Sequence, residues 1–514
     1  MNKLWSALNH HASTKPDEIA ILRFDKALHG VLSWRALRDE VAALAARLAE
    51  DGVQVLALQA GNSAAWIIAD IACSLQDIAL LPLPSFFSAT QIQHALHSLH
   101  IDAVLSDQEQ LLLSLSDTQF LRAGQLHGLA YLRANPAQAA RDNAALLPPS
   151  TCKITFTSGS TGTPKGVCLS AQHLQAVTSA LLDATAACDI NRHLCVLPLA
   201  SLLENIAGVH APLRRGAQVV VADEASLGFN GASGFALPTF LRALSLCRPN
   251  SMILIPQLLD ALVSSCDAGW RLPDSLAFVA VGGATVSPAL LERAWAHGLP
   301  AYEGYGLSEC GSVVSLNTPL ARKNGSLGRV LGHTQVDIVD GETMVKGPAF
   351  LGYVGARDSW SSVRGAQAFA TGDLAYVDDD GYLHYQGRRK NLLVTSYGRN
   401  ISPEWVEAEL NAEVEIAFSS VFGDSRPYCV ALIATPVEGI SDARIQAALE
   451  RANERLPAYA RVQRWLRLPS PSLRANASEE GLLTSNGRPR REHIYRRFQH
   501  ALEELYTTEL SEKS

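Results

Sequence analysis

The residues between positions 155 and 166 constrain this chain more than any other segment. They read Thr-Phe-Thr-Ser-Gly-Ser-Thr-Gly-Thr-Pro-Lys-Gly and follow a short apolar stretch. Glycines let a ligand come close to backbone N–H groups, while the hydroxyls and the Lys165 ammonium add donors and positive charge. Such a loop suits phosphate groups, and a nucleotide triphosphate is a natural ligand for it. The segment therefore predicts a strand that leads into an anion-binding loop.

Two other interpretations of this loop fit less well. A Walker sequence places its lysine between Gly and Ser or Thr, whereas Lys165 lies between Pro164 and Gly166. This spacing disfavours a P-loop NTPase. A solvated Gly/Ser linker is the remaining alternative, but linkers seldom carry a lone lysine between proline and glycine.

The first 300 residues alternate between helical periodicity and short apolar runs, which is typical of layered α/β folds. The expected helices include residues 34–48 and 64–75. The expected strands cover residues 53–58, 78–83, 153–157, 218–222, 252–255 and 278–281. Continuous apolar runs of this length predict parallel strands that are buried between helices.

The pattern changes after about residue 325. Short alternating strands are expected at residues 336–339, 343–346 and 382–386, between Gly and Asp turns. The last part of the chain predicts a compact α+β unit, with a loop at 469–476. Its expected strands cover 417–422, 428–434 and 461–468, and its expected helices cover 441–456 and 490–506. A length of 514 residues also predicts more than one domain.

Charge and cysteine usage exclude several classes of function. The net charge of −7 is mixed along the chain, so no basic field indicates a nucleic-acid partner. The nine cysteines are scattered, without a Cys-x-x-Cys pair or a cluster of histidines, and are expected to be reduced core residues of a cytoplasmic protein. The N-terminus lacks the apolar run of a signal peptide, and no apolar stretch is long enough to predict a membrane span.

Further motifs follow the loop in a fixed order. They are Leu-Pro-Leu-Ala-Ser-Leu-Leu-Glu at 197–204, Gly-Gly-Ala at 282–284, Tyr-Gly-Leu-Ser-Glu at 305–309, Thr-Gly-Asp at 371–373, Gly-Arg-Arg-Lys at 387–390 and Ser-Asn-Gly-Arg at 485–488. Together with the loop they resemble the motifs of the adenylate-forming (AMP-binding) superfamily. That superfamily includes acyl-CoA synthetases, aryl-CoA ligases, luciferases and peptide-synthetase adenylation domains. The motif sequences are most similar to those of long-chain fatty acyl-CoA synthetases, and the resemblance covers nearly the whole chain.

The resemblance implies an α/β fold with two domains. A large N-terminal adenylation domain over residues 1–389 would combine layered α/β subdomains with a small β-barrel. A smaller, mobile α+β C-terminal domain would cover residues 390–514. Lys390 would lie at the hinge, because members of the superfamily rotate the small domain between adenylation and thioester formation.

The resemblance also implies a role for each motif. The catalytic residues would be Lys165, Ser308, Glu309 and Arg488, with Glu309 as the Mg²⁺ ligand. The residues that contact ATP would be Thr157, Ser158, Gly159, Ser160, Thr161, Gly162, Lys165, Gly282, Gly283, Ala284, Tyr305, Gly306, Ser308, Asp373 and Arg388. Gly398 would line the path of a pantetheine thiol. The implied cofactors are ATP, Mg²⁺ and CoA, or the phosphopantetheine of a carrier protein.

The expected acyl pocket is apolar. Its candidate residues are Ala200, Ser201, Leu203, Gly208, Val281 and Leu307. Ser201 replaces the histidine of the long-chain motif Leu-Pro-Leu-Ala-His. No Asp occurs between Leu194 and Ala222, so an amino acid's ammonium would lack that counter-ion. We therefore expect a medium- or long-chain fatty acid as the substrate.

Arg488 departs from the superfamily, which normally has a catalytic lysine at this position. Arginine keeps the positive charge but is bulkier and planar, so Arg488 could act less well or reflect a general replacement of Lys by Arg.

An aryl acid as the substrate, or transfer to an acyl carrier protein in place of CoA, is an alternative function. A non-catalytic nucleotide- or acyl-binding homologue is a further alternative, which only Arg488 and Ser201 support. The basic run Arg488, Arg490, Arg491, Arg496 and Arg497 could contact CoA or a carrier protein, or could be a solvated helix face.

Overall fold

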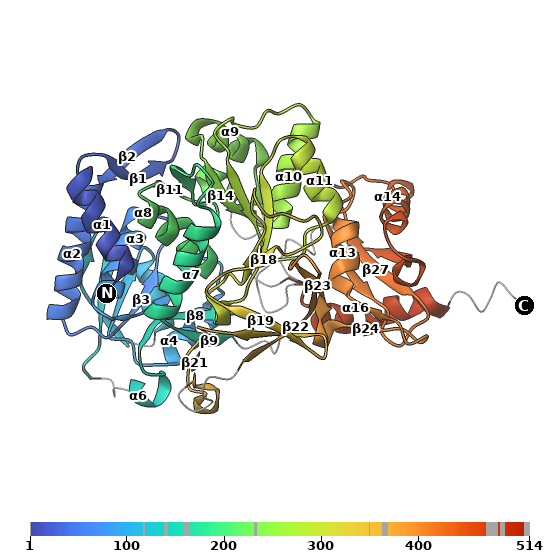
Figure 1. Cartoon of the computed structure of the whole chain (residues 1–514). Coiled ribbons are helices and arrows are strands. Elements are labelled where there is room, and N and C mark those ends of the chain that lie inside the picture. The colour runs from blue at the N-terminus through green and yellow to red at the C-terminus, as the bar shows by residue number, and fades with distance from the viewer. Residues whose placement is uncertain are drawn as a thin grey trace, which may run out of the picture.

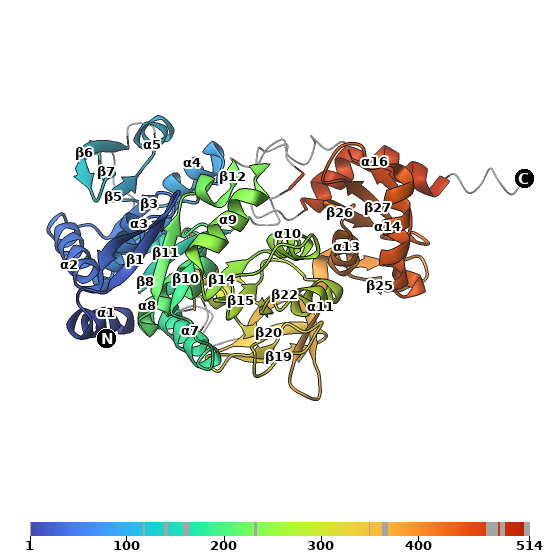
Figure 2. The ribbon, with the colours of Figure 1, turned by 90° about the horizontal axis from the view of Figure 1, so that it is seen from above.

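A computed structural model describes most of the chain (Figure 1). The described residues are 2–116, 119–137, 142–157, 164–230, 234–348, 350–361, 368–468, 482–483 and 489–507. In both views the C-terminal elements lie at the opposite end of the molecule from the first helices, α1 (Lys3–Thr14) and α2 (Trp34–Glu50) (Figure 2). The loop expected at residues 469–476 lies outside the described residues, as do the expected phosphate-loop residues 158–163 and Arg488.

A large sheet carries the central motifs. Its described strands run in the order β18 (Arg329–Val330), β17 (Ser315–Leu316), β16 (Ala301–Tyr305), β15 (Phe278–Val281), β14 (Ser251–Leu254), β10 (Arg192–Leu194), β11 (Gln218–Ala222), β1 (Ile19–Phe24) and β2 (Leu28–Ser33). The pairings from β16 to β1 are parallel. One face of this sheet packs against α9 (Leu237–Cys247), α10 (Pro256–Asp267) and α11 (Pro288–Ala296).

A second sheet carries the glycine-rich loop. Its described strands run in the order β21 (Gly352–Tyr353), β9 (Lys165–Ser170), β8 (Thr151–Thr157), β4 (Ala79–Pro82), β3 (Val55–Gln59), β5 (Ala103–Ser106), β7 (Leu129–Ala134) and β6 (Phe120–Leu126). Strand β8 pairs in parallel with β4, as expected, but it pairs antiparallel with β9. The chain therefore returns after the loop as a hairpin, which places Lys165 opposite Thr157. The expected strands of this sheet thus pair in parallel with one another, while the antiparallel strands β9, β21, β7 and β6 were not expected.

The helix α3 (Ala64–Leu75) lies between the two sheets. Its core side chains belong to one cluster with residues of β3 and β4 on one side and of β11 on the other. Because both faces of α3 are covered, its sequence is apolar nearly all round. Ser63 begins the helix, since its side chain accepts a hydrogen bond from Trp66 N. The helices α4 (Ala89–His97) and α5 (Glu109–Leu115) pack on the outer face of the second sheet.

The remaining helices of the large domain connect or flank the sheets. They are α6 (Asn143–Leu146), α7 (Ala171–Ala184), the π-helix η1 (Glu204–His210) and α8 (Ala211–Arg215). Serine also begins α2, α4 and α7, where Ser33, Ser88 and Ser170 accept hydrogen bonds from backbone N–H groups of the first turn. A two-stranded sheet joins β12 (Phe229–Asn230) and β13 (Gly234–Phe235).

The segment expected as a small β-barrel forms an antiparallel sheet. Its described strands run in the order β19 (Gln335–Val339), β20 (Glu342–Lys346), β22 (Phe369–Val377) and β23 (Leu383–Arg388). An isolated bridge between Arg329 and Tyr382 connects it with the edge of the large sheet. The expected strands 336–339, 343–346 and 382–386 correspond to β19, β20 and β23, and their ends differ from those of the observed strands by two residues or fewer.

The C-terminal part has the expected α+β composition. Its three-stranded sheet has the order β26 (Phe418–Phe422), β27 (Cys429–Ala434) and β28 (Val462–Arg467), next to the short pair β24 (Leu393–Val394) and β25 (Asn400–Ile401). Its helices are α13 (Pro403–Asn411), α14 (Asp442–Glu454) and α16 (Arg491–Thr507). The expected fold class is thus confirmed, with layered α/β subdomains followed by a smaller α+β part.

A buried polar network ties these layers together. Asp70 on α3 lies 2.6 Å from Lys153 Nζ on β8, and its other oxygen lies 2.7 Å from both Asn205 Nδ2 and His210 Nε2 on η1. Lys153 also contacts Asn205. Burial alone would raise the pKa of Asp70, but Lys153 and His210 hold that pKa well below its ordinary range. The network therefore contains a fully buried ion pair between α3 and the second sheet.

Replacement of Asp70 tests this network. Asp70→Asn should lower the free energy of unfolding by about 3–5 kcal/mol, because Lys153 would keep a buried charge without its partner. Asp17→Asn is the matched control, since Asp17 forms an exposed ion pair with Arg35 and should cost less than about 1 kcal/mol. Urea unfolding followed by circular dichroism measures both. Equal effects of the two substitutions would contradict the assignment.

Candidate active site

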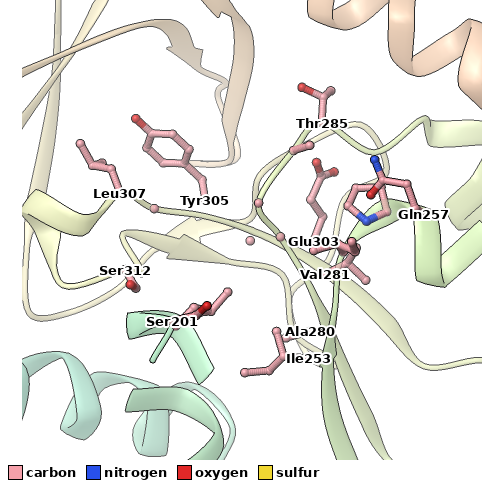
Figure 3. A pocket seen from close by; sticks show the side chains of 18 of the residues that line it. Ser201, Ile253, Gln257, Ala280, Val281, Thr285, Glu303, Tyr305, Leu307 and Ser312 are labelled. Carbon is pink, nitrogen blue, oxygen red and sulfur yellow. The ribbon is translucent and has the colours of Figure 1, made fainter. Parts of the chain in front are cut away.

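A cavity of about 1060 Å³ lies at the carboxyl ends of β14, β15 and β16. Open α/β sheets commonly bind ligands at this edge of the sheet. Residues of the C-terminal part, including Glu404, Glu407 and Arg491, line the opposite wall. Figure 3 shows side chains from β14, β15 and β16 and from the segment before η1 around the cavity. The site is therefore built from both parts of the chain.

Three predicted residues from distant motifs meet at one end of the cavity. The Tyr305 hydroxyl, at the end of β16, donates a hydrogen bond of 2.7 Å to Asp373 Oδ2 on β22. Arg388 lies directly opposite Asp373 in the sheet, with Nε 3.4 Å from Oδ1. Burial and the Asp373 carboxylate raise the pKa of Tyr305 well above its ordinary value. The phenol therefore stays protonated, and it orients a nearly buried carboxylate at the cavity wall.

The small residues of two motifs leave room beside this carboxylate. Gly282, Gly283 and Ala284 follow β15 and line the cavity. Gly306 follows Tyr305, and a Cβ atom there would lie 1.9 Å from the carbonyl oxygen of Ser312. The close packing of that backbone thus requires glycine at position 306.

The predicted phosphate and metal residues lie near one another on a neighbouring wall. Lys165 begins β9, and its ammonium lies 5.4 Å from the centre of the Tyr353 ring. Ser308 and Glu309 belong to the short 3-10 helix η3 (Ser308–Cys310), and Tyr353 donates a hydrogen bond of 2.9 Å to Glu309 Oε1. These four residues and Thr157 all line the cavity. A carboxylate in such polar surroundings is a hard oxygen ligand and fits Mg²⁺.

Several predicted residues cannot be placed. Ser158, Gly159, Ser160, Thr161, Gly162 and Arg488 lie outside the described residues. Their roles stay predictions.

The structure places most of the predicted acyl-pocket residues in the cavity wall. Ala200, Ser201, Leu203, Val281 and Leu307 line it, but Gly208 does not. A Cβ atom at Gly208 would lie 2.2 Å from Glu204 Oε1 and 2.7 Å from His193 Nε2. Gly208 therefore makes room for a buried side-chain pair behind the wall, and its expected contact with the substrate stays a prediction.

That pair is one feature that sequence reasoning missed. Glu204 Oε1 lies 2.9 Å from His193 Nε2, while Oε2 accepts a hydrogen bond of 3.0 Å from Leu197 N. His193 Nδ1 lies 2.9 Å from Ser251 Oγ. The absence of Asp between Leu194 and Ala222 does not leave that segment without an acidic side chain, because Glu204 lies within it. Because Glu204 is buried and paired with His193, it offers no unpaired charge to a substrate ammonium.

The same pair approaches Cys195. Ligand atoms of His193, Cys195 and Glu204 all lie within 4.8 Å of one another, which is a spacing that a metal ion could use. However, both ring nitrogens of His193 and both oxygens of Glu204 already have hydrogen-bond partners. The cluster is accounted for as a polar support of the cavity wall.

Gly398 lies outside the cavity. It occupies the turn between β24 and β25 with φ of +73°, and no heavy atom lies within 4 Å of a Cβ built there. Its positive φ explains the glycine. Gly398 is not among the residues that line the cavity in this arrangement, and its expected role beside a pantetheine thiol stays a prediction.

Lys390 lies where the hinge was expected. It belongs to the short helix η5 (Arg389–Asn391) between β23 and β24, and it lines the cavity. Burial and the neighbouring Arg388 lower the pKa of Lys390. Asn391 donates a hydrogen bond of 2.6 Å to Glu404 of α13. This short connection contacts both parts of the chain, and its movement stays a prediction.

The basic run at the C-terminus is only partly available to a partner. Arg491 is buried and forms two hydrogen bonds, of 2.6 and 2.9 Å, with the Glu407 carboxylate. It also donates to the carbonyl of Val421. Arg491 therefore joins α16 to α13 and β26 and is not part of a solvated helix face, while a contact of the basic run with CoA or a carrier protein stays a prediction. Arg496 and Arg497 lie on α16.

Comparison with known proteins identifies the family. The family model described as AMP-binding enzyme matches residues 8–355, and the model of its C-terminal domain matches residues 390–510. The chain belongs to the AMP-binding enzyme family. Curated relatives of this AMP-binding enzyme are CoA ligases. The expected membership in the adenylate-forming superfamily is confirmed, and these curated relatives belong to the expected class of acid–thiol ligases.

Two relatives show how far the similarity extends. A 2-succinylbenzoate–CoA ligase of Bacillus velezensis is 29% identical over 312 residues, which is 58% of this chain and 60% of that relative. The match thus spans less than two thirds of that relative's length. A long-chain-fatty-acid–CoA ligase of Mycobacterium bovis is 24% identical over 607 residues, which covers 97% of this chain and 96% of that relative.

A solved structure supports the fold. The structure of an anthranilate CoA ligase in complex with anthranoyl-AMP has a TM-score of 0.78 at 18% identity, and it covers 98% of each chain. This likeness shows the fold of the AMP-binding enzyme. Within the described part of the chain, no helix is both long enough and apolar enough to cross a membrane.

Glu303 is a second feature that sequence reasoning missed. It lies on β16 two residues before Tyr305, is 3% exposed, and lines the cavity (Figure 3). Val286 N donates a hydrogen bond of 3.1 Å to its Oε1. Burial raises the pKa of Glu303 to about 8, against which this hydrogen bond acts only weakly. The side chain is therefore protonated at neutral pH.

The pKa of Glu303 predicts a pH dependence of stability. Its pKa is raised from 4.5 in the unfolded chain to about 8 in the folded chain, so the unfolded chain alone loses this proton between those values. Its contribution is fully present below pH 4.5 and is lost as pH rises through 8. Relative to Glu303→Gln, the parent should lose up to about 1.4 kcal/mol of unfolding free energy per pH unit in this window.

Urea unfolding at pH 5, 6, 7 and 8 measures this difference. The Gln variant is itself the control, because it keeps the shape and the Val286 hydrogen bond but does not titrate. Parallel pH profiles for the two proteins would rule out a buried, titrating Glu303.

Proposed function

We propose that this AMP-binding enzyme activates a hydrophobic carboxylic acid with ATP and transfers the acyl group to the thiol of CoA. In the first step a carboxylate oxygen bonds to the α-phosphorus of ATP as the bond to pyrophosphate breaks. In the second step the thiol sulfur bonds to the acyl carbon as AMP leaves. The observation that carries this proposal is a single cavity that has polar side chains near Asp373 and Glu309, its polar end, and largely apolar side chains beyond Ser201, its apolar arm.

The polar end supports the ATP half of the proposal. Asp373, held by Tyr305 and Arg388, would accept hydrogen bonds from the ribose hydroxyls. The backbone at Gly282–Ala284 would face adenine. Ser308 would donate to the α-phosphate, and Lys165 with Thr157 and residues 158–162 would hold the outer phosphates. These groups would spread the negative charge that builds up at the phosphoryl centre.

Glu309 would hold Mg²⁺ at this end of the cavity. The bound ion would neutralise phosphate charge, which is the chemistry that a metal supplies in phosphoryl transfer. Arg488 would be the small domain's cation for the α-phosphate, because it occupies the last position of the motif at 485–488.

The apolar arm supports the acid half of the proposal. Beyond Ser201 the cavity is lined largely by apolar side chains from α7, the connection between α7 and β10, η1, α8 and β14, among them Leu181, Leu182, Ile190, Ala207, Ala211 and Ile253. Burial of each methylene in such a channel contributes about 0.8 kcal/mol. The acidic group nearest to Ser201 in sequence, Glu204, is already paired with His193. A fatty acid therefore fits this arm better than an amino acid does.

Arg215 lines the cavity together with these apolar side chains. Its guanidinium donates to the carbonyl groups of Cys188 and Thr185 at 2.8 and 2.9 Å, beyond the end of α7. It also donates to the Thr185 hydroxyl at 2.7 Å. A basic side chain that satisfies carbonyls at the C-terminal end of a helix is a common cap. Here the cap also borders the cavity, so it would limit the length of the acyl chain.

A panel of acids tests the proposed function. With ATP, Mg²⁺ and CoA, kcat/KM should rise up to about fourfold with each added methylene until the channel is filled. Release of AMP and formation of CoA thioester measure the reaction, with aryl acids, free amino acids and an acyl carrier protein as the other arms. An amino acid as the best substrate would contradict the proposal, and the absence of any acid-dependent AMP release would favour a non-catalytic homologue.

The pair Arg214 and Arg215 provides a matched control for the channel. Arg215→Ala should shift the preferred acid toward longer chains, because it removes a long side chain from the cavity wall. Arg214→Ala should leave the preference unchanged, since Arg214 contacts Gln175 and Ser179 and does not line the cavity. The comparison uses the ratio of activities with long and short acids, which cancels a loss of folded protein. Equal ratios in both variants would show that the acyl chain does not reach Arg215.

A further inference from the structure

A short strand connects the two phosphate-facing motifs of the cavity. Strand β21 pairs antiparallel with β9, with Tyr353 opposite Val167. Leu351 N donates to Cys168 O at 2.7 Å, and Val354 N donates to Gly166 O at 2.8 Å. This strand therefore runs beside the backbone that leaves the glycine-rich loop.

The same segment is also joined to the turn that carries Glu309. Phe350 N donates a hydrogen bond of 2.8 Å to the backbone carbonyl of Glu309. Thus one stretch of chain, from residue 350 to residue 354, is hydrogen-bonded on one side to the phosphate-loop strand and on the other to η3.

The side chain of Tyr353 repeats this connection within the cavity. Its hydroxyl donates to Glu309 Oε1 at 2.9 Å, and the centre of its ring lies 5.4 Å from the Lys165 ammonium. A cation at this distance from an aromatic ring is attracted by the ring's negative face. Tyr353 therefore contacts both the proposed metal ligand and the proposed phosphate lysine, which are 144 residues apart in the chain.

Tyr353 is held firmly in this position. Its backbone N–H donates to Ser359 Oγ at 2.9 Å, and its carbonyl accepts from Trp360 Nε1 at 3.1 Å. Its ring packs against Phe350, with 4.9 Å between the ring centres. At the preceding residue, Gly352, a Cβ atom would lie 2.6 Å from the Trp360 ring, so the backbone fits closely there. The hydroxyl is thus a fixed donor toward Glu309.

We propose that Tyr353 is a positioning residue that couples magnesium binding to phosphate binding. Its hydroxyl fixes the Glu309 carboxylate for the metal, and its ring holds Lys165 near the phosphates of the same nucleotide. Partners of this kind, behind a metal ligand, orient the ligand and commonly change metal affinity by 10- to 100-fold when removed. The inference rests on the proposed use of Mg²⁺ and ATP, but it concerns binding and needs no acid or CoA.

Calorimetric binding of ATP, once with Mg²⁺ and once with EDTA, tests this coupling. In the parent, Mg²⁺ should tighten ATP binding. Tyr353→Phe removes only the hydroxyl and should reduce that tightening about tenfold, while ATP binding in EDTA stays unchanged. Tyr353→Leu also removes the ring from Lys165 and should weaken ATP binding in EDTA by roughly two- to fivefold. Tyr376→Phe is the matched control, because Tyr376 is exposed and stacks on His384 away from the cavity.

A double variant shows whether the hydroxyl acts through Glu309. Addition of Tyr353→Phe to Glu309→Gln should cause no further loss of the Mg²⁺ effect. The proposal is overturned if Mg²⁺ tightens ATP binding equally in Tyr353→Phe and Tyr376→Phe, or if Tyr353→Phe loses as much ATP affinity with EDTA as with Mg²⁺. It is also overturned if Mg²⁺ does not tighten ATP binding by the parent. If the binding measurements give the expected results but no acid causes release of AMP, the proposed function is overturned and the role of Tyr353 is not.

Discussion

The buried contact between Asp70 and Lys153 is the interaction on which the large domain depends. It joins α3 to β8, and through Asn205 and His210 it extends to the π-helix that follows β10. The second sheet, α3 and the π-helix, which contributes Ala207 to the cavity wall, are thereby fixed relative to one another. Because an unpaired charge at this depth would be costly, the network admits few alternative arrangements of these elements.

The cavity has a polar end and an apolar arm because of how these elements are arranged. The π-helix carries Ala207 toward the cavity, while its Glu204 is buried against His193 behind the wall. At the other end, Tyr305 and Asp373 meet from separate sheets. A polar region and an apolar arm in one cavity suit a ligand that combines a nucleotide with an apolar acyl group. This is the form of an acyl-adenylate, in which the two are joined at the α-phosphate.

Much of the fold, and part of the site, could be predicted from the sequence because those features are local. Apolar runs such as Gln218–Ala222 and ordered motifs such as 305–309 are visible in short windows. Contacts across the chain are not. Nothing near Glu204 predicts that His193 pairs with it, and a run of arginines does not reveal that Arg491 is buried against Glu407. The roles of Tyr353 and Glu303 depend on strand pairing and burial, which only the folded chain supplies.

The most direct test of this account is a search for the adenylate itself. The protein is incubated with ATP, Mg²⁺ and a long-chain fatty acid in the absence of CoA, and small molecules released by denaturation are identified by mass spectrometry. The account predicts acyl-AMP, in an amount approaching one per chain, together with pyrophosphate. An adenylate that forms only with a free amino acid, or no adenylate with any acid in the panel, would contradict it.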